Sequence, residues 1–268
     1  MSPLPPKTAI GLPFIELPET GSTNMYAMDR LQANLAAHGT AFFAHHQTAG
    51  KGQRGKSWQS EPGSQIALSV VADTSWLSLS NAFPLSVAVA LAAHDLYSAY
   101  AGEETRIKWP NDIYWRDRKA GGILIENIVR GNNWPWAVIG IGMNVNQKTF
   151  PETIQTAVSL KQITGRDFSA AALAKELCSH LETRYQQLRD QQFDKMLTEY
   201  NEKLYRRNQA TKLKKGSITF HCVIESVSPT GELLVSGSHR FRFGEVEWKG
   251  GGTEEQGARN GGAGIGGE

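Results

Sequence analysis

The order of strand and helix patterns along the chain constrains its fold more than any other feature of the sequence. Between about residues 11 and 166, short runs rich in β-branched residues are bounded by Gly, Asn or Asp, which is typical of strands, and helical patterns lie between some of them. Strands and helices do not alternate strictly, so the pattern predicts an α+β fold. The predicted strands are residues 40–46, 65–72, 105–109, 122–129 and 137–146, and the predicted helices are residues 22–37, 81–100 and 169–188.

A second pattern, of strands without helices, runs from about residue 204 to residue 249. Four apolar residues alternate with polar neighbours, which predicts a half-buried strand, and shorter strands follow a turn. About 45 residues of short strands suggest a small barrel or half-barrel packed on the larger domain. The positions concerned are Ile218, Phe220, Cys222 and Ile224, the turn 229–231, and the strands 233–235 and 240–243.

The last 19 residues, 250–268, differ in composition from the rest of the chain. Nine of them are glycine, and Ile265 is the only large apolar residue. Such a segment cannot bury enough apolar surface to offset the entropy lost on ordering it, so we expect a disordered tail. The sequence therefore predicts a larger domain over residues 1–203, a small β domain over 204–249 and a Gly-rich tail over 250–268.

Composition argues against several classes of protein. A formal net charge of +2 over 268 residues lacks the basic excess of a general nucleic-acid binder. Apolar runs are shorter than the roughly 20 residues of a membrane helix, and residues 1–11 lack the apolar core of a signal peptide. Cys178 and Cys222 are too few for a disulfide framework or a Cys-based zinc cluster. We expect two reduced core thiols in a cytoplasmic protein that has neither DNA nor a membrane as a partner.

A glycine-rich basic segment, GKGQRGK at residues 50–56, follows the predicted strand at 40–46. Its three glycines let backbone N–H groups approach an anion, and Lys51, Arg54 and Lys56 carry charge of the matching sign. The spacing is neither that of a phosphate-binding P-loop nor that of a dinucleotide-binding loop. Taken alone, the segment is equally consistent with an anion-binding loop and with a solvated hairpin turn.

Three further clusters place polar residues beside predicted strands. In KWPND, Asn111 and Asp112 can either meet a ligand or form an Asx turn. In RKAGGILIE, Lys119 leads into a buried strand, where it either binds phosphate or carboxylate oxygens or is simply solvated. In GIGMNVN, small residues indicate a bulge or close backbone approach, and Asn144 offers both a donor and an acceptor, as adenine recognition requires.

Each cluster is ambiguous alone, but the set in this order resembles the biotin protein ligases, enzymes that attach biotin to carrier proteins. The resemblance covers the chain from about Thr20 to Trp248 and rests on G-[RK]-G-x-x-G, K-W-P-N-D and K-x-x-G-I-L-[IV]-E. Outside these motifs it includes Ser22, Thr23, Asn24, Gln47 and Trp58. It implies an α/β catalytic domain around a mixed sheet, followed by a small SH3-like β domain, and this division agrees with the one predicted above.

The resemblance also implies a role for each matching residue. Ser22, Thr23 and Gln47 match residues that hydrogen-bond the ureido ring of biotin. The full set of implied biotin-binding residues is Ser22, Thr23, Asn24, Gln47, Gly50, Lys51, Gly52, Gln53, Trp58, Lys119 and Gly122. The implied ATP- and adenylate-binding residues are Lys51, Arg54, Lys56, Asn111 and Asn144. The implied catalytic residues are Lys119, Asp112 and Arg54, with Asp112 also near Mg²⁺.

The family uses ATP and Mg²⁺ to activate the biotin carboxylate as biotinyl-5′-adenylate. A lysine of the biotin carboxyl carrier protein domain of a biotin-dependent carboxylase then attacks this mixed anhydride. A carboxylate attacking a phosphate brings two anions together, so such a site needs cations and N–H donors where charge accumulates. Lys51, Arg54, Lys56 and Lys119 match that requirement, and the chemistry needs no covalent nucleophile.

Two features depart from the bifunctional members of that family. Their loop reads G-R-G-R-R-G-R, whereas Lys51 and Gln53 here replace two arginines, so we expect weaker retention of the adenylate. About 20 residues precede Ser22, fewer than the roughly 60 that a winged helix-turn-helix domain needs, so we expect no repressor function.

Three alternatives are compatible with the sequence. The first is a lipoate or octanoate ligase of the same fold, against which the K-W-P-N-D motif, the basic loop and the small β domain argue. The second is a DNA-binding regulator with biotinyl-adenylate as co-effector, which the short N-terminus and modest charge disfavour. The third is an inactive ligand-binding protein, which the presence of Lys119, Asp112 and Asn144 disfavours. The family includes monomers and dimers, so a homodimer is compatible with the sequence.

Overall fold

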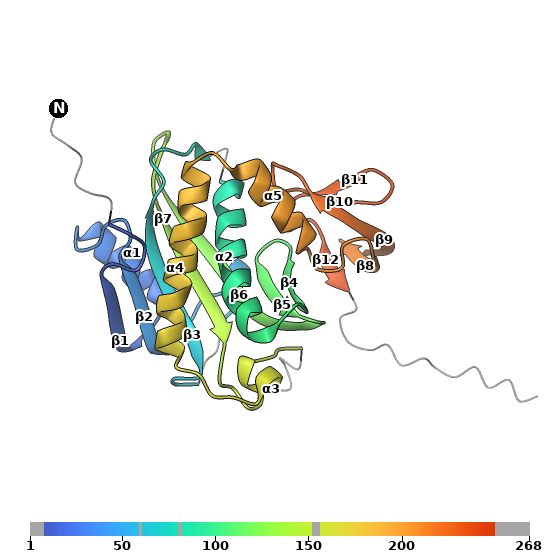
Figure 1. The fold of residues 1–268 in the computed structure, drawn as a ribbon. Helices are drawn as coiled ribbons and strands as arrows, with labels where there is room; N and C mark the ends of the chain where they lie inside the picture. Colours follow the sequence, from blue (N-terminus) through green and yellow to red (C-terminus); the bar gives the residue numbers. More distant parts are fainter. Residues whose placement is uncertain (1–7, 59–60, 80–81, 152–155, 250–268) are drawn as a thin grey trace, which may run out of the picture.

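The structure is a computed structural model that describes residues 8–58, 61–79, 82–151 and 156–249. These residues form two β-sheets and five α-helices (Figure 1). In chain order the elements are β1 (Phe14–Thr20), α1 (Thr23–Gln32), β2 (Ala41–Gln47), the 3₁₀ turn η1 (Gln53–Gly55), β3 (Gln65–Asp73), α2 (Phe83–Ala101), β4 (Thr105–Lys108), β5 (Asp112–Trp115), β6 (Arg118–Arg130), β7 (Asn133–Asn144), α3 (Leu160–Thr164), α4 (Ala170–Arg189), α5 (Phe193–Glu202), β8 (Ala210–Lys215), β9 (Ile218–Val227), β10 (Leu233–Val235), β11 (His239–Phe241) and β12 (Glu247–Lys249).

The first sheet has seven strands in the order β1-β2-β3-β7-β6-β5-β4. β1 and β2 run parallel, and every other neighbouring pair runs antiparallel. The α+β fold and its mixed sheet are therefore confirmed. All strands and helices predicted in this part of the chain form, whereas β1, β5, α3 and α5 were not predicted, because short segments carry little periodic signal.

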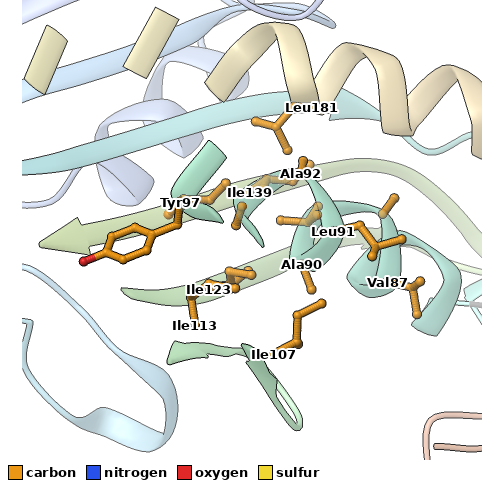
Figure 2. Packing of buried hydrophobic residues seen from close by; sticks show 14 of the residues in the cluster. Val87, Ala90, Leu91, Ala92, Tyr97, Ile107, Ile113, Ile123, Ile139 and Leu181 are labelled. Atoms are coloured by element: carbon orange, nitrogen blue, oxygen red, sulfur yellow. The ribbon is translucent and has the colours of Figure 1, made fainter. Parts of the chain in front are cut away.

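Side chains of the first sheet build an apolar layer on each face, since successive residues of a strand point to opposite sides. On β2, Phe42 packs with α1, whereas Phe43 belongs to the larger core beneath α2 and α4. Leu91 and Ala92 of α2 are fully enclosed between the sheet and Leu181 of α4 (Figure 2). The sheet is thus covered by α2 and α4 on one face and by α1 on part of the other.

The second sheet has five antiparallel strands in the order β11-β10-β9-β8-β12. It lies beside α5 and the hairpin of β4 and β5 (Figure 1). The strands predicted in this part correspond to β9, β10 and β11, and β8 and β12 were not predicted. This part of the chain therefore forms an antiparallel sheet, and its described strands leave β11 and β12 as edges rather than closing into the predicted barrel.

Two predicted boundaries differ from the structure for local reasons. α1 ends at Gln32 instead of residue 37, because Asn34 has a φ of 58° and a right-handed helix does not continue through such a residue. β6 begins at Arg118 instead of residue 122, because Arg118 and Lys119 already pair with Trp115 and Tyr114 of β5.

Both cysteines are buried free thiols, as predicted. Burial raises the pKa of Cys178 to about 12, so this thiol stays protonated at neutral pH. Across the described ranges, no helix combines the length and the apolar character that crossing a bilayer would need. The predicted Gly-rich tail, 250–268, lies outside the described residues.

Candidate active site

The candidate site lies on the face of the first sheet that α1 covers only in part. Val138, Gly140 and Gly142 of β7 share this face, because residues two apart in a strand point the same way. Val138 packs beneath α1, whereas the two glycines leave the sheet bare beyond the helix. A pocket occupies this bare area. Of the predicted site residues, it brings together Ser22, Thr23, Asn24, Gln47, Lys51, Gly52, Gln53, Trp58, Asn111, Asp112, Lys119 and Gly122.

The two glycines let other side chains rest directly on β7. A Cβ atom on Gly140 would lie 2.3 Å from Oδ1 of Asn24, and one on Gly142 would lie 2.6 Å from Cε2 of Trp58. Asn24 and Trp58 therefore meet the strand two residues apart, which is roughly 7 Å along its axis. The pocket has two ends, one beside each of these side chains, with a floor of glycine backbone between them.

The end beside Asn24 is neutral and rich in hydrogen-bonding groups. The backbone N–H of Thr23 donates to Oε1 of Gln47 at 2.8 Å, and the Thr23 hydroxyl donates to the same oxygen at 3.1 Å. Oγ of the buried Ser69 lies 2.7 Å from Oγ1 of Thr23 and 2.6 Å from Oδ1 of Asn24. The Asn24 amide donates to Glu126 at 2.7 Å. This network fixes Thr23, Asn24 and Gln47 in the orientation in which they line the pocket.

The end beside Trp58 carries an ion pair. Nζ of Lys119 lies 2.7 Å from Oδ1 of Asp112 and 5.7 Å from the centre of the Trp58 ring. The Lys119 and Asp112 side chains are 33% and 22% exposed, so a ligand can reach them. The Lys119 backbone is held on both sides, since its N–H donates to the Thr156 carbonyl at 2.6 Å and its carbonyl accepts from Val158 at 2.8 Å. An anion here would meet a cation on a rigid strand.

The glycine-rich segment forms a hairpin that extends from residue 50 to residue 58. Trp58 closes its base by donating its backbone N–H to the Gly50 carbonyl at 2.8 Å. A Cβ atom on Gly50 would lie 2.4 Å from the Trp58 carbonyl oxygen, so this glycine serves the closure of the hairpin rather than the described pocket wall. Lys51 and Gln53 line the pocket, and the Gln53 amide donates to the Ile123 carbonyl at 3.4 Å.

The tip of this hairpin turns toward the second sheet. Arg54 donates to the Gly244 carbonyl at 3.0 Å, and Lys56 interacts electrostatically with Glu247 of β12. Neither Arg54 nor Lys56 is among the described residues that line the pocket. The structure therefore does not bring these two sequence-predicted adenylate contacts to the site.

The K-W-P-N-D segment connects the pocket to the second sheet. Asn111 donates its amide to the Ile123 carbonyl at 2.7 Å, at the edge of the pocket. The buried Trp109 donates its indole N–H to the Gly231 carbonyl at 3.0 Å, and its own carbonyl accepts from the Trp248 indole at 3.3 Å. Trp109 is thus hydrogen-bonded to two separate parts of the second sheet. These bonds anchor the K-W-P-N-D segment, which ends at the pocket, to that sheet.

Lys108 of the same segment is enclosed by aromatic rings. Its Nζ lies 4.3 Å from the ring centre of Tyr114, 5.6 Å from that of Tyr205 and 5.3 Å from that of Trp248. Burial lowers the pKa of Lys108 to about 8. This side chain fills the junction between the sheets and is not part of the described pocket lining. Next to the junction, a second cavity shares Gln53, Asn111 and Ile123 with the pocket.

The resemblance implies that Asn144 contacts ATP or the adenylate, but in the structure its side chain is buried and hydrogen-bonded to other residues. It is 5% exposed, and its amide donates to the carbonyls of Lys119 at 3.4 Å and Val158 at 3.1 Å. Its Oδ1 accepts from Gln147 at 3.1 Å. With these bonds the side chain supports the backbone of Lys119, outside the described lining of the pocket.

Sequence reasoning missed two buried polar residues of β3, Gln65 and Ser69. Oε1 of Gln65 accepts from the Trp58 indole at 2.9 Å, while its Nε2 has no hydrogen-bond partner among the described residues. A buried donor left unpaired costs about 1–3 kcal/mol, which a ligand or a water that accepts from it would offset. Polar residues four apart on one face of an otherwise apolar strand were the available signal.

The pocket is neutral and polar at one end, lined by backbone along its floor and cationic at the other end. This order suits an elongated molecule with a hydrogen-bonding head and an anionic tail. The fold and the site define an α+β protein with a polar pocket that ends at a lysine fixed on a sheet. Residues 16–144 match the model of the Biotin/lipoate A/B protein ligase family.

Individual relatives confirm the resemblance expected from the sequence. The chain is 32% identical over 174 residues to the bifunctional ligase/repressor BirA of Escherichia coli (strain K12), covering 62% of this chain and 52% of BirA. It is 34% identical over 176 residues to the biotin–[acetyl-CoA-carboxylase] ligase of Mycobacterium tuberculosis, covering 64% of each. The chain therefore spans about half the length of the BirA proteins that it matches.

Among solved structures, the chain is similar to the biotin protein ligase from Aquifex aeolicus in complex with biotin and ATP. The TM-score is 0.74 at 24% identity, with 88% of this chain and 97% of that chain covered. The fold described above is therefore that of a biotin protein ligase.

Proposed function

We propose that this chain is an ATP-dependent biotin protein ligase, which activates biotin as biotinyl-5′-adenylate and transfers it to a lysine of a carboxylase's biotin carboxyl carrier domain. The observation that carries the proposal is the order of uncharged polar, backbone and charged groups from one end of the pocket to the other. Biotin consists of a ureido ring, an apolar ring and chain, and a carboxylate. The neutral end at Thr23 and Gln47, the glycine floor and the Lys119–Asp112 pair follow the same order.

The neutral end separates biotin from lipoate and octanoate, which the name of the family also admits. All three ligands end in a carboxylate that suits Lys119. Only biotin has a head that both donates and accepts hydrogen bonds, and the pocket wall at Thr23 and Gln47 is polar. A pocket with buried polar groups rejects an apolar head, because those groups would lose water without gaining a partner. The proposal therefore favours biotin over lipoate.

In the first step, a carboxylate oxygen of biotin attacks the α-phosphorus of ATP. A P–O bond forms, the bond between the α-phosphorus and the bridging oxygen breaks, and pyrophosphate leaves with the electron pair. Both reactants are anions, and negative charge grows on the phosphate oxygens. Lys119 offsets that charge and Lys51 adds a second cation from the hairpin, while Asp112 orients the Lys119 ammonium.

Mg²⁺ accompanies ATP in phosphoryl and nucleotidyl transfer, where it neutralises charge on the phosphates. Within the described ranges, no three His, Cys, Asp or Glu side chains gather into a metal site. Mg²⁺ is commonly held by one or two carboxylates together with substrate phosphates, a requirement that the single carboxylate of Asp112 fits. Asp112 would hold the ion jointly with the nucleotide.

In the second step, the amine of the carrier lysine attacks the carbonyl carbon of the anhydride. An amide C–N bond forms, the C–O bond to the phosphate breaks, and AMP leaves. The amine gives up a proton, for which the Asp112 carboxylate in the pocket wall is an acceptor.

The domain assignment follows from the same proposal. Residues 1–203 form the catalytic domain, residues 204–249 correspond to the SH3-like domain of biotin protein ligases, and residues 250–268 are an appended tail. The antiparallel sheet of β8 to β12 supports this correspondence. A cytoplasmic location fits a protein that consumes ATP and modifies a carboxylase.

The test is pyrophosphate release with biotin and lipoate as competing substrates. We expect release with biotin and little with lipoate. Thr23→Val removes the hydroxyl donor at the neutral end while keeping the side-chain volume, so it should weaken use of biotin and leave any use of lipoate unchanged. Equal release with both acids would refute the assignment of the substrate, and release with neither would refute adenylation.

A further inference from the structure

Arg54 joins two segments that are 190 positions apart in the sequence. Its Nη2 donates to the Gly244 carbonyl at 3.0 Å, and its Cζ lies 5.2 Å from the centre of the Phe243 ring. The side chain therefore makes a hydrogen bond and a cation–π contact with one turn of the second sheet. It does so from the tip of the hairpin whose base closes the pocket.

The turn that receives Arg54 is closed on itself. The N–H of Arg242 donates to the Glu245 carboxylate at 2.9 Å, and the N–H of Glu245 donates back to the Arg242 carbonyl at 3.1 Å. Gly244 has a φ of 88°, and a Cβ atom there would lie on the Arg54 guanidinium, 1.9 Å from its Nη2. The absence of a side chain at this position is therefore what lets the guanidinium dock.

The residue that makes this contact adopts an unfavourable backbone conformation. Arg54 has φ 57° and ψ 38°, the left-handed region that a non-glycine residue adopts only at a cost. The adjacent Gln53 lines the pocket, and Lys51 lies on the same arm of the hairpin. The orientation of these two side chains therefore depends on where the tip is held.

We propose that Arg54 is a positioning residue. Docked on the turn at Phe243 and Gly244, it holds the hairpin so that Lys51 and Gln53 face the pocket, and the second sheet thereby sets the affinity for the ligand. The inference rests on the proposed function only in naming biotin as that ligand. It assigns Arg54 a role away from the phosphate contact that the resemblance implies.

The test compares two variants that break the contact from opposite sides. Arg54→Met removes the charge and keeps most of the side-chain length, whereas Gly244→Ala keeps Arg54 intact and expels its guanidinium. Gly237→Ala is the matched control, because Gly237 also has a positive φ, 79°, in a turn of the second sheet that does not touch the hairpin. Each variant is measured by calorimetric binding of biotin without ATP, and by the rate at which a lysine-specific protease cleaves after Lys51 and Lys56, because trypsin would also cut after Arg54.

Loss of an exposed charge-assisted hydrogen bond should weaken biotin binding about tenfold in each variant and speed cleavage of the hairpin by a similar factor. The double variant should again bind biotin about tenfold more weakly and not a hundredfold, because both changes remove the same contact. Gly237→Ala should bind and be cleaved like the unaltered chain.

Three results would overturn the proposal: additive effects in the double variant, an equal loss in Gly237→Ala, or normal biotin binding and cleavage in Gly244→Ala. If Arg54→Met binds biotin normally and only adenylation is slowed, Arg54 contacts the phosphate and the proposal is wrong. If the unaltered chain itself binds no biotin, the proposed function fails, and the cleavage rates still decide whether Arg54 holds the hairpin.

Discussion

The Lys119 ammonium lies 2.7 Å from the Asp112 carboxylate, and the strands that carry them, β6 and β5, are hydrogen-bonded neighbours. The register shifts between Ile113 and Tyr114, so that Lys119 pairs with Tyr114 while Gly121 pairs with Ile113. The cation at the pocket is therefore carried by a strand of the sheet, and the segment at Thr156 and Val158 also holds its backbone. Such a preorganised charge needs little rearrangement when negative charge develops beside it.

Replacing Lys119 should affect the first step most. Lys119→Ala should slow biotin-dependent pyrophosphate exchange by about 10²–10³, or about 3–4 kcal/mol, as for one preorganised donor. Transfer from synthetic biotinyl-adenylate should suffer less, because the encounter of the two anions is already complete. Stability should change little, since the side chain is partly solvated. Normal exchange in this variant would assign the role to another cation, with Lys51 the first to test.

The floor of the pocket should tolerate no added methyl group. In Gly142→Ala the new Cβ would lie 2.6 Å from the Trp58 ring, so Trp58 must move off the strand. We expect biotin binding to weaken about 10–100-fold, corresponding to about 1–3 kcal/mol of overpacking. Gly21→Ala is the control, because a Cβ atom at Gly21 meets no atom within 4 Å. Unchanged calorimetric affinity in Gly142→Ala would show that the ligand does not lie against Trp58.

A charge at position 53 should hold the adenylate for longer. Gln53 lines both the pocket and the second cavity, so an arginine there would add a cation at the edge of the site. Gln53→Arg should slow adenylate release by at most the worth of a charge-assisted hydrogen bond, about 1.5–3 kcal/mol. Stopped-flow release from the preformed adenylate complex measures this directly. Release at the original rate would mean that this part of the hairpin does not contact the phosphate.

Lys108 should make stability depend on alkaline pH. Its pKa is about 8 in the folded chain against 10.5 as an ordinary lysine, so the unfolded chain binds more protons between these values. Stability from this group therefore rises with pH across that window, by up to about 3 kcal/mol at 1.36 kcal/mol per unit.

The variant Lys108→Met isolates the contribution of Lys108 to stability, because other groups also titrate in this pH range. Urea unfolding at intervals from pH 7 to above 10 should show the variant most favoured relative to the unaltered chain at the lowest pH, with the difference shrinking as pH rises. A difference that stays constant across the window would show that Lys108 titrates alike in both states.

The residues that the structure gathers at the pocket were named from the family resemblance and not from strand register, because β1 and β5, which help to position them, were not predicted. Lys119, Asp112 and Gly122 meet because β5 and β6 pair, and glycines in a strand already indicated close approach. Thr23 and Gln47 meet because α1 starts where β1 ends and β2 runs parallel to β1. Long apolar patterns predicted α2, α4 and most strands of the first sheet.

Features set by distant partners escaped prediction. A basic residue in a glycine-rich segment suggests a contact to the adenylate. The direction of the Arg54 side chain is instead set by its hydrogen bond to Gly244, in a turn of the second sheet. Asn144 has the chemistry for adenine, yet the carbonyls of Lys119 and Val158 occupy its amide. The pairing of Gln65 with the Trp58 indole depends on how the hairpin folds back, which no local pattern of residues encodes.

The two hydrogen bonds of Trp109 bear on the modularity of this protein. Its indole N–H reaches Gly231 and its carbonyl receives the Trp248 indole, although Trp109 itself lies inside the segment 16–144 that carries the family match. A polypeptide cut after β7 would expose this buried ring together with both of its unpaired polar groups, directly beside Asn111 and Asp112. The segment that matches the family therefore depends on residues well outside it: the buried contacts that hold Trp109 extend to Trp248.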